Sequence, residues 1–561
     1  MKRPSAITLV TFLLAGLFAI PVVTVVAHLF YPATDTWAHL VDTVLASYIQ
    51  NSLWLIIAVG AGTLVIGAGT AWLVTMCRFP LRAGFEWALI LPLAVPSYVI
   101  AYAYTDFFQF AGPFQQAIRE LMGWGMQEFR LPNIRSLGGA MIVFTLVLFP
   151  YVYLIARTAF LQQSVSVLEV SRSLGASPRQ AFFRVALPLA RPALAAGVAL
   201  ALMETLADFG AVSYFGVPTF TTGIYRAWFS MGDKIAAAQL STLLLVFVAL
   251  LLSLEAWSRR KRRYHHTTGQ YRRLKRFELR GWRAGAATLA CGLPVFLGFV
   301  LPALILANLA IGAGDGQITA RYLGLVRNTL TLGLLTAALA VPVALLVAYA
   351  MRRRGGLAIT AAGRIAGLGY AIPGSIIAVG VLIPFAAFDN MLDGLARQWF
   401  GISTGLLLTG SILALVFAYL VRFLSVALQT TEAGLQKITP SMDAAAATLG
   451  AGPGRTLLRV HAPLLKGSLL TAYLLVLVDV MKELPATLIM RPFNFDTLAV
   501  QAHNLASDER LAEAALPALT IVLVGLVPVI LLSRIVARSR PGEDAAAPAG
   551  GGTERVTIVT G

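Results

Sequence analysis

Long continuous apolar runs recur along the whole of this 561-residue chain, which is 58% hydrophobic and only 12% charged. A helix that crosses the hydrocarbon core of a bilayer needs about 20 mostly apolar residues, and it satisfies its own backbone hydrogen bonds there. The runs that meet this requirement lie at 7–29, 51–76, 85–106, 137–161, 192–213, 236–257, 285–311, 326–351, 363–385, 404–427, 466–490 and 514–534. We therefore expect an all-α membrane protein with about 12 transmembrane helices.

The formal net charge of +18 comes from 44 basic and 26 acidic residues. In a water-soluble protein this excess would suggest a nucleic-acid partner, but in a membrane protein basic loops mark the cytoplasmic side. Residues 259–283 are rich in Lys and Arg, and alternate loops between the runs are basic. This pattern predicts two cytoplasmic termini, and the lipid bilayer rather than nucleic acid as the partner. The first apolar run, from Ile7 to Phe30, is longer than the apolar region of a signal peptide, so we expect an uncleaved first span.

The two halves of the chain repeat each other. Asn51-Ser-Leu matches Asn328-Thr-Leu, and Pro96 matches Pro373 at the same spacing. Further along, SLGASPRQAFFRVALPLA (173–190) matches TLGAGPGRTLLRVHAPLL (448–465). An even number of predicted spans separates the matching points, so the halves have parallel topology and can enclose a translocation path between them.

This duplication predicts the domain organisation of the chain. We expect an N-terminal half of six spans at 1–257, a basic cytoplasmic linker at 258–284, and a C-terminal half of six spans at 285–540. The last residues, 541–561, are rich in Pro, Gly and Ala, and we expect a disordered cytoplasmic tail.

One segment of the first half, 162–190, has the pattern of a loop that contacts another protein. Gly allows the sharp turn that a short helix needs when it leaves and re-enters the membrane, and Pro is tolerated best in the first turn of the next helix. The spacing of Glu169, Gly175 and Pro188, with Leu187 before the proline, resembles the EAA loop of binding-protein-dependent ABC importer permeases. The resemblance implies the type I ABC importer permease fold, and a contact between Glu169 and a separate ATPase subunit.

A second copy of this loop lies at 430–465. Gly450 and Pro463 keep their places, but Ala444 stands where the first copy has its glutamate, and the nearest acid, Asp443, is one residue early. We expect this loop to dock as well, without the same salt bridge. The candidate coupling residues are Glu169, Gly175, Pro188, Asp443, Gly450 and Pro463.

Two pairs of acids lie in or near apolar runs at matching positions of the halves, Glu204 with Asp208 and Asp479 with Glu483. Each pair has i, i+4 spacing and so lies on one helix face. Ionisable residues within a span are costly and usually face the interior of the bundle. One interpretation is a ring of negative charge along a path for a cation. The other is helix packing, with ion pairs to neighbours such as Lys482 or Arg491.

Two further segments resemble one group of ABC importer permeases in particular. YRAWF (225–229) and RPFNFDT (491–497) resemble the corresponding segments of ferric iron ABC permeases, and this resemblance extends over nearly the whole chain in its fused two-half form. It implies ferric iron as the cargo. It also implies two copies of an ABC ATPase subunit and a periplasmic ferric-binding protein as partners.

The sequence offers no catalytic site and no metal site. A phosphate-binding P-loop requires Gly-Lys followed by Ser or Thr, and the chain contains no Gly-Lys pair. Its six histidines and two cysteines show no metal-ligand spacing. We therefore expect a transport subunit rather than an enzyme, with no cofactor of its own and with ATP bound by the partner subunit.

Two alternatives stay open at this point. A secondary transporter can also have 12 spans in two parallel halves, but it would not need coupling loops. An ABC permease for thiamine, a phosphonate or another small solute would share those loops, although an anionic cargo fits poorly beside four acids.

Overall fold

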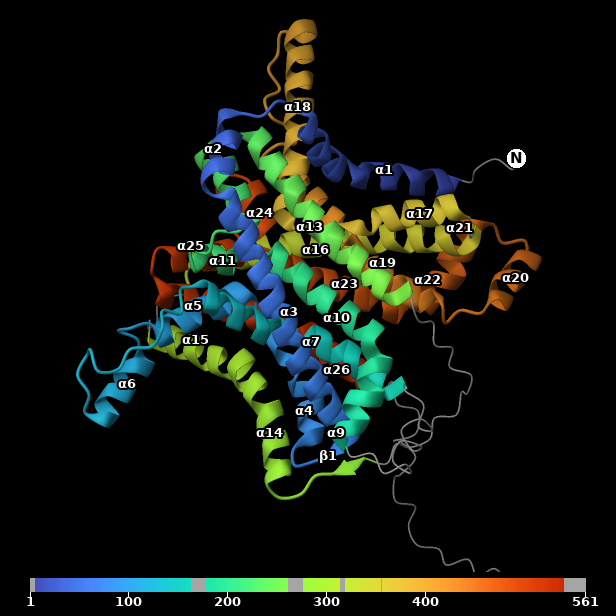
Figure 1. Ribbon diagram of the computed structural model, residues 1–561. Coiled ribbons are helices and arrows are strands. Elements are labelled where there is room, and N and C mark those ends of the chain that lie inside the picture. The colour runs from blue at the N-terminus through green and yellow to red at the C-terminus, as the bar shows by residue number, and fades with distance from the viewer. Residues whose placement is uncertain (1–5, 163–177, 261–275, 313–317, 355, 539–561) are drawn as a thin grey trace, which may run out of the picture.

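The computed structural model describes residues 6–162, 178–260, 276–312, 318–354 and 356–538 (Figure 1). Within these residues, 10 helices are long and apolar enough to cross a membrane, and two sharply bent helix pairs bring the number to 12. The expectation of an all-α membrane protein is thereby confirmed. Glu169, Gly175 and the predicted tail at 541–561 lie outside the described residues.

The first half contains these elements: α1 (Ala6–Ala27), η1 (His28–Phe30), α2 (Asp35–Thr43), α3 (Leu45–Met76), β1 (Cys77–Arg78), α4 (Arg82–Ala88), η2 (Leu91–Ala94), α5 (Ser97–Phe108), α6 (Pro113–Met122), α7 (Leu137–Gln162), α9 (Pro178–Gln180), η3 (Ala181–Ala186), α10 (Leu187–Ala207), α11 (Gly210–Tyr214), α12 (Phe220–Tyr225), η4 (Arg226–Ser230) and α13 (Lys234–Arg260).

The second half contains these: β2 (Phe277–Glu278), α14 (Trp282–Val295), η5 (Phe296–Val300), α15 (Leu301–Gly312), α16 (Ala320–Arg354), α17 (Leu357–Ala366), η6 (Leu368–Ala371), α18 (Gly374–Phe400), α19 (Ile412–Leu435), α20 (Pro440–Thr448), α21 (Pro453–Thr456), η7 (Leu457–His461), α22 (Ala462–Leu464), α23 (Lys466–Met481), α24 (Pro485–Met490), α25 (Leu498–Ser507) and α26 (Leu511–Arg538).

Each half is built around a trio of long helices. In the first half α3 packs along α7, and α10 packs against both; in the second half α16, α19 and α23 make the same contacts. In each half a short 3-10 turn and a proline precede the next helix, at Pro96 and Pro373. The order of elements therefore repeats, as the sequence repeat predicts.

Four of the expected spans, 85–106, 192–213, 363–385 and 466–490, are interrupted rather than continuous helices. The chain bends by 90° between the segments 82–94 and 97–122, so the expected span 85–106 is interrupted at Pro96. A second bend, of 79°, separates 453–464 from 466–481 and so precedes the expected span 466–490. That span is itself interrupted, because α23 already ends at Met481. At Pro96 the cause is local, because proline lacks an N–H and restricts the residue before it to extended conformations.

The halves interlock through their first and last helices. α1 packs against α17 and α18 of the second half, while α26 packs against η2 and α5 of the first half (Figure 1). Both crossings depend on glycine: a Cβ on Gly380 would lie 2.3 Å from the carbonyl oxygen of Pro21, and one on Gly525 would lie 2.4 Å from that of Ala94. The close backbone approach joins the halves into one bundle.

Candidate functional site

A central cavity of about 120 Å³ lies between the two halves. Its wall is formed by the turn between η2 and α5, by α7 and by the end of α10 from the first half. From the second half, η6, α19 and the end of α23 contribute. The cavity thus lies where the long helices α10 and α23 end and the chain turns into the short helices α11 and α24.

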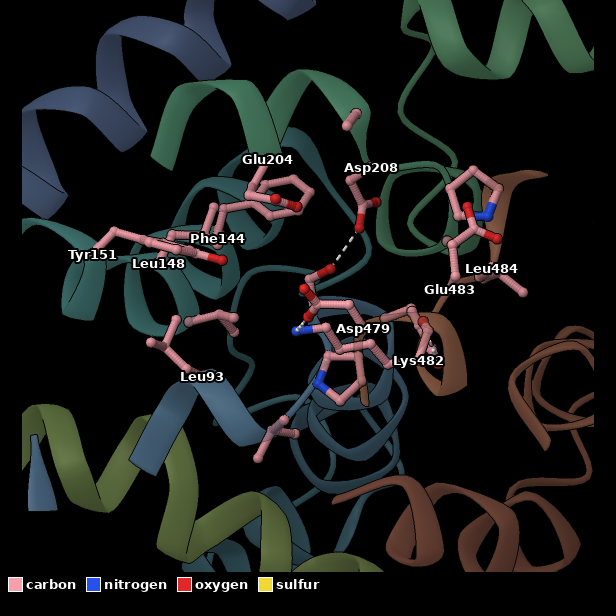
Figure 2. A pocket seen from close by; sticks show the side chains of 18 of the residues that line it. Leu93, Phe144, Leu148, Tyr151, Glu204, Asp208, Asp479, Lys482, Glu483 and Leu484 are labelled. Atoms are coloured by element: carbon pink, nitrogen blue, oxygen red, sulfur yellow. Dashed lines mark hydrogen bonds and ion pairs between the residues drawn. The ribbon is translucent and has the colours of Figure 1, made fainter. Parts of the chain in front are cut away.

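All four acids singled out in the sequence line this cavity (Figure 2). Glu204 lies one turn before the end of α10 and Asp208 directly follows that helix. Asp479 lies in the last turn of α23, and Glu483 follows that helix by two residues. The structure therefore brings together the two pairs that lie far apart in the chain, one from each half.

Asp208 is held at the beginning of α11. Its Oδ1 accepts the backbone N–H groups of Ala211 at 2.9 Å and Val212 at 3.3 Å, and its Oδ2 accepts the Ser97 hydroxyl at 2.5 Å (Figure 2). A carboxylate in this position satisfies N–H groups that have no partner within the helix. Asp208 thus fixes the geometry of the break at the end of α10.

Glu483 has the same role at the beginning of α24. Its two carboxylate oxygens accept the N–H groups of Ala486 at 2.9 Å and Thr487 at 3.0 Å, and the Thr487 hydroxyl donates to Oε2 at 2.6 Å. The Arg422 guanidinium from α19 adds an ion pair, with Nη1 3.5 Å from Oε1. Gly374 makes room for this pair, because a Cβ there would lie 2.2 Å from Arg422 Nη1.

Glu204 and Asp479 differ from the capping acids. Among the described residues no group donates a hydrogen bond to Glu204, whose carboxylate lies beside Tyr151 in the cavity (Figure 2). Asp479 pairs with Lys482, with 2.8 Å between Oδ1 and Nζ. The alternative interpretation of the acids as ion-pair partners thus applies to Asp479 and also to Glu483, which pairs with Arg422. Arg491 pairs with Asp496 outside the cavity.

The cavity is therefore acidic, but its described residues form no chelating cluster. Four carboxylates face two cationic side chains, Arg422 and Lys482. Within the described residues no three His, Cys, Asp or Glu side chains gather closely enough to hold a metal ion. Such a site can attract a cation without binding it tightly, as conduction through a path requires.

Sequence reasoning missed Ser97, Arg422 and the phenols of Tyr151 and Tyr370, all of which line the cavity. One signal for Ser97 was present, because it follows Pro96 in the pair of matching prolines. Arg422 carries a charge within an apolar run, which is the same signal that singled out the acids.

A layer of aromatic side chains adjoins the cavity. Tyr98 lines it, and one turn further along α5 the Tyr102 hydroxyl lies 2.7 Å from Nδ1 of His503 in α25. A Cβ on Gly210 would lie 2.7 Å from both Leu484 and Tyr98, so the halves touch closely here. His503 also lines a separate pocket of about 460 Å³ beyond this layer.

The coupling-loop candidates are only partly within the described residues. Pro188 lies in the first turn of α10, directly after the π-helical turn η3, and Pro463 lies in the first turn of α22, directly after η7. Gly450 follows α20 with φ of 71°, a left-handed conformation that favours glycine. The equivalent turn of the first loop contains Gly175 and is not described.

Asp443, in the first turn of α20, is engaged within its own half. Its Oδ2 accepts the Arg352 guanidinium at 2.8 Å and its Oδ1 lies 2.6 Å from Nε2 of the buried His461. Burial alone would raise the pKa of the Asp443 carboxyl, but the hydrogen bonds and charges of Arg352 and His461 outweigh it and hold that pKa below its usual range. The acid thus anchors α20 to the end of α16.

Comparison with known proteins identifies a family and several relatives that this chain resembles. Residues 63–263 match the family described as "Binding-protein-dependent transport system inner membrane component". The chain is 28% identical to the "Fe(3+)-transport system permease protein FbpB 2" of Haemophilus influenzae, over 87% of this chain and 90% of that protein. It is 25% identical to the "Putative ferric transport system permease protein FbpB 1" of the same organism, over 84% of this chain and 75% of that protein. It is 31% identical to the "Sulfate transport system permease protein CysW" of Escherichia coli, over 37% of this chain and 72% of that protein.

Proposed function

This chain belongs to the family of inner-membrane components of binding-protein-dependent transport systems, and from that premise we propose that it forms the translocation path of an ATP-driven importer for ferric iron. The observation that carries the proposal is the central cavity, where four carboxylates from two similar halves face one another. Ferric ion is strongly cationic, and a cavity with more carboxylates than cationic groups lowers the cost of bringing it into a low-dielectric region.

The extent of the similarity supports this cargo. The two Haemophilus relatives named as ferric permeases match at least 84% of the chain, whereas the sulfate permease matches 37% of it. An oxyanion importer is the second candidate, because that sulfate permease has a similar identity over the region it shares. The acidic cavity argues against it, since sulfate would meet four carboxylates.

Energy and cargo come from partners in this proposal. The chain contains no Gly-Lys pair and so no P-loop. In this proposal it is the transport subunit, and a partner hydrolyses ATP. Two copies of an ABC ATPase subunit would dock on the loops at 162–190 and 430–465, one on each half. A periplasmic ferric-binding protein would deliver the ion to the opposite face. Both termini would then be cytoplasmic, on the side of the basic loops.

The mechanism follows from the contacts at the cavity. Asp208 and Glu483 hold the breaks at which α10 and α23 end, so a movement of either long helix moves the cavity wall. Closure of the ATPase dimer would shift the halves between arrangements that expose the cavity to one side or the other, which is a shift in populations driven by nucleotide. Glu204 and Asp479 would compensate the charge of the passing ion.

The decisive experiment is transport by the complete system. The chain is reconstituted in proteoliposomes with the ATPase and the binding protein, and uptake of radiolabelled ferric ion, sulfate and molybdate is measured with and without ATP. The proposal expects ATP-dependent uptake of ferric ion alone. Uptake of an oxyanion instead, or uptake driven by a proton gradient without ATP, would contradict it.

A further inference from the structure

A groove of about 530 Å³ lies away from the central cavity, at the end of the bundle where α3 ends and α14 begins. One wall is α14. The other consists of the end of α3 together with α9 and η3, which precede α10. The short parallel pairing of β1 with β2, Cys77 opposite Phe277, ties the two walls together at this end.

The floor of the groove is apolar and follows the α14 helix. Ala286 and Ala290, one turn apart on this helix, leave a furrow that Leu73 and Phe182 border on the opposite side. Aromatic side chains stand at the rim, where Trp282 is 73% exposed and Phe183 is 63% exposed. A furrow of this kind on the surface of a membrane protein is filled by an apolar chain, because its apolar walls offer water no hydrogen-bond partners.

The mouth of the groove is cationic. Arg179 from α9 and Arg283 from α14 both line it, and none of the described residues that line the pocket is acidic. In the described part of the chain no carboxylate pairs with either guanidinium. The Arg283 guanidinium lies over the Trp282 ring, 5.8 Å from its centroid, which keeps it at the rim beside the exposed aromatic.

We propose that this groove binds one anionic phospholipid, with its phosphate between Arg179 and Arg283 and an acyl chain along the α14 furrow. The charge of the mouth and the polarity of the floor select this occupant together. A water-soluble phosphate would satisfy the arginines but leave the furrow empty, and a zwitterionic lipid would fill the furrow but bring no net negative charge. Basic clusters beside spanning helices select anionic lipid headgroups in this way.

The position of the groove gives the lipid a consequence for transport, and this part rests on the proposed function. Arg179 and Phe182 belong to the later part of the predicted coupling loop at 162–190, which leads directly into α10. A lipid that contacts both this segment and α14 would hold the end of the coupling loop against the second half. Binding itself does not depend on the cargo, so it can be tested separately.

The test uses the full chain in nanodiscs that contain equal amounts of phosphatidylcholine and phosphatidylglycerol. Native mass spectrometry then counts the lipids of each kind that stay bound on release from the disc. The parent protein should retain one phosphatidylglycerol in preference. Arg179→Gln/Arg283→Gln should lower the preference for phosphatidylglycerol over phosphatidylcholine by roughly 30-fold, which corresponds to about 1 kcal/mol for each guanidinium at a membrane surface.

Two further variants make the result specific. Arg327→Gln/Arg364→Gln removes the same charge from two exposed arginines outside the groove and should retain the lipid as the parent does. Ala290→Trp fills the furrow without changing charge and should reduce retention of phosphatidylglycerol. The proposal is overturned if the parent retains both lipids equally or neither, or if the two double variants behave alike.

Discussion

Asp208 and Glu483 each accept backbone N–H groups from the short helix that follows them, whereas Glu204 and Asp479 cap no such helix among the described residues. The four acids thus separate into a capping pair and a cavity-facing pair. Both pairs consist of one residue from each half. The separation matters because capping residues contribute to folding, while residues whose charge faces the cavity contribute to what passes through it.

Neutralising the cavity-facing pair should slow transport without unfolding the protein. A charge several ångströms from a passing cation is worth on the order of 1–2 kcal/mol at the effective dielectric of a protein site. Glu204→Gln and Asp479→Asn should therefore each lower the initial rate of ferric uptake in proteoliposomes by roughly tenfold. The thermal midpoint of Glu204→Gln should stay near that of the parent, whereas Asp479→Asn also removes the partner of Lys482 and should lower the midpoint.

The capping pair allows a sharper comparison. Asp208→Ala removes the cap of α11 and should cost about 1 kcal/mol of stability, whereas Asp208→Asn keeps a capping oxygen and should keep most of it. Thermal unfolding of the purified protein measures both. If alanine and asparagine lower the midpoint equally, charge rather than capping determines the role of Asp208.

Gly374 should tolerate no side chain. A Cβ there would lie 2.2 Å from Arg422 Nη1 and 2.6 Å from Glu483 Oε1, so Gly374→Ala should force this buried ion pair apart. Overpacking of this kind costs about 1–3 kcal/mol. Thermal unfolding in detergent checks the loss. Ser97, the matching residue of the first half, already carries a Cβ, so Ser97→Ala removes only a hydroxyl and is the matched control. A Gly374→Ala protein as stable as the parent would refute this explanation.

At this scale the sequence predicted which acids would meet but not what each would contact. The i, i+4 spacing and the register of the repeat are enough to place Glu204 and Asp208 opposite Asp479 and Glu483. The capping role depends on where α10 and α23 end. Hydropathy does not show that point, because the apolar run continues through the break.

Among the elements, α20 is attached to its own half through polar contacts of Asp443. It lies at the edge of the bundle (Figure 1), and Asp443 in its first turn joins it to Arg352 and His461. The matching position in the first loop is Leu168, whose aliphatic side chain cannot form an ion pair. The second loop is therefore fixed to its own half by a contact that Leu168 cannot make in the first loop.

This contact predicts a pH dependence for α20. The pKa of Asp443 is lower in the folded state than its ordinary value of about 4, so the ionised carboxylate stabilises the attachment at every pH above that value. The contribution is lost as the pH falls through the lower folded pKa. Hydrogen exchange of α20, corrected for the intrinsic rate, should be constant from neutral pH to about 5 and rise only at more acidic pH.

Asp443→Asn provides the check on this assignment. It should raise the exchange of α20 already at neutral pH and remove the acid-dependent step. Asp42→Asn, at an exposed acid in α2, is the control for a lost negative charge. An acid-dependent step that persists in Asp443→Asn would assign the effect to another group.

Hydropathy predicted the long helices well and the interrupted ones poorly. The runs 51–76 and 137–161 lie within the continuous helices α3 and α7. The first run contains neither a charged residue nor a proline, and the only charged residue of the second is Arg157 near its end. The expected span 85–106 contains Pro96, and the chain turns by 90° there. A window average cannot show such a turn, since both arms of the bend are apolar.

In the whole molecule, the duplication was predicted and the interlocking was not. Matching residues reveal that two similar bundles exist, but they do not reveal which bundle each terminal helix joins. That choice is made by close packing, as where Gly380 of α18 meets the backbone of α1 and Gly525 of α26 meets that of η2. The halves should therefore depend on each other for stability.

Dividing the chain between residues 260 and 276 tests this dependence. When residues 1–260 and 276–561 are expressed together, the exchanged contacts of α1 and α26 can still form, so the halves should copurify through a tag on either one. Expressed alone, each half leaves the partner-facing side of its terminal helix uncovered, and it should be recovered in lower amount with a broad size-exclusion profile. Gly380→Leu in the divided protein, which would meet the Pro21 backbone, should abolish copurification. If either half alone is monodisperse and unfolds at the same temperature as the pair, each half folds independently and the interlocked helices contribute little to stability.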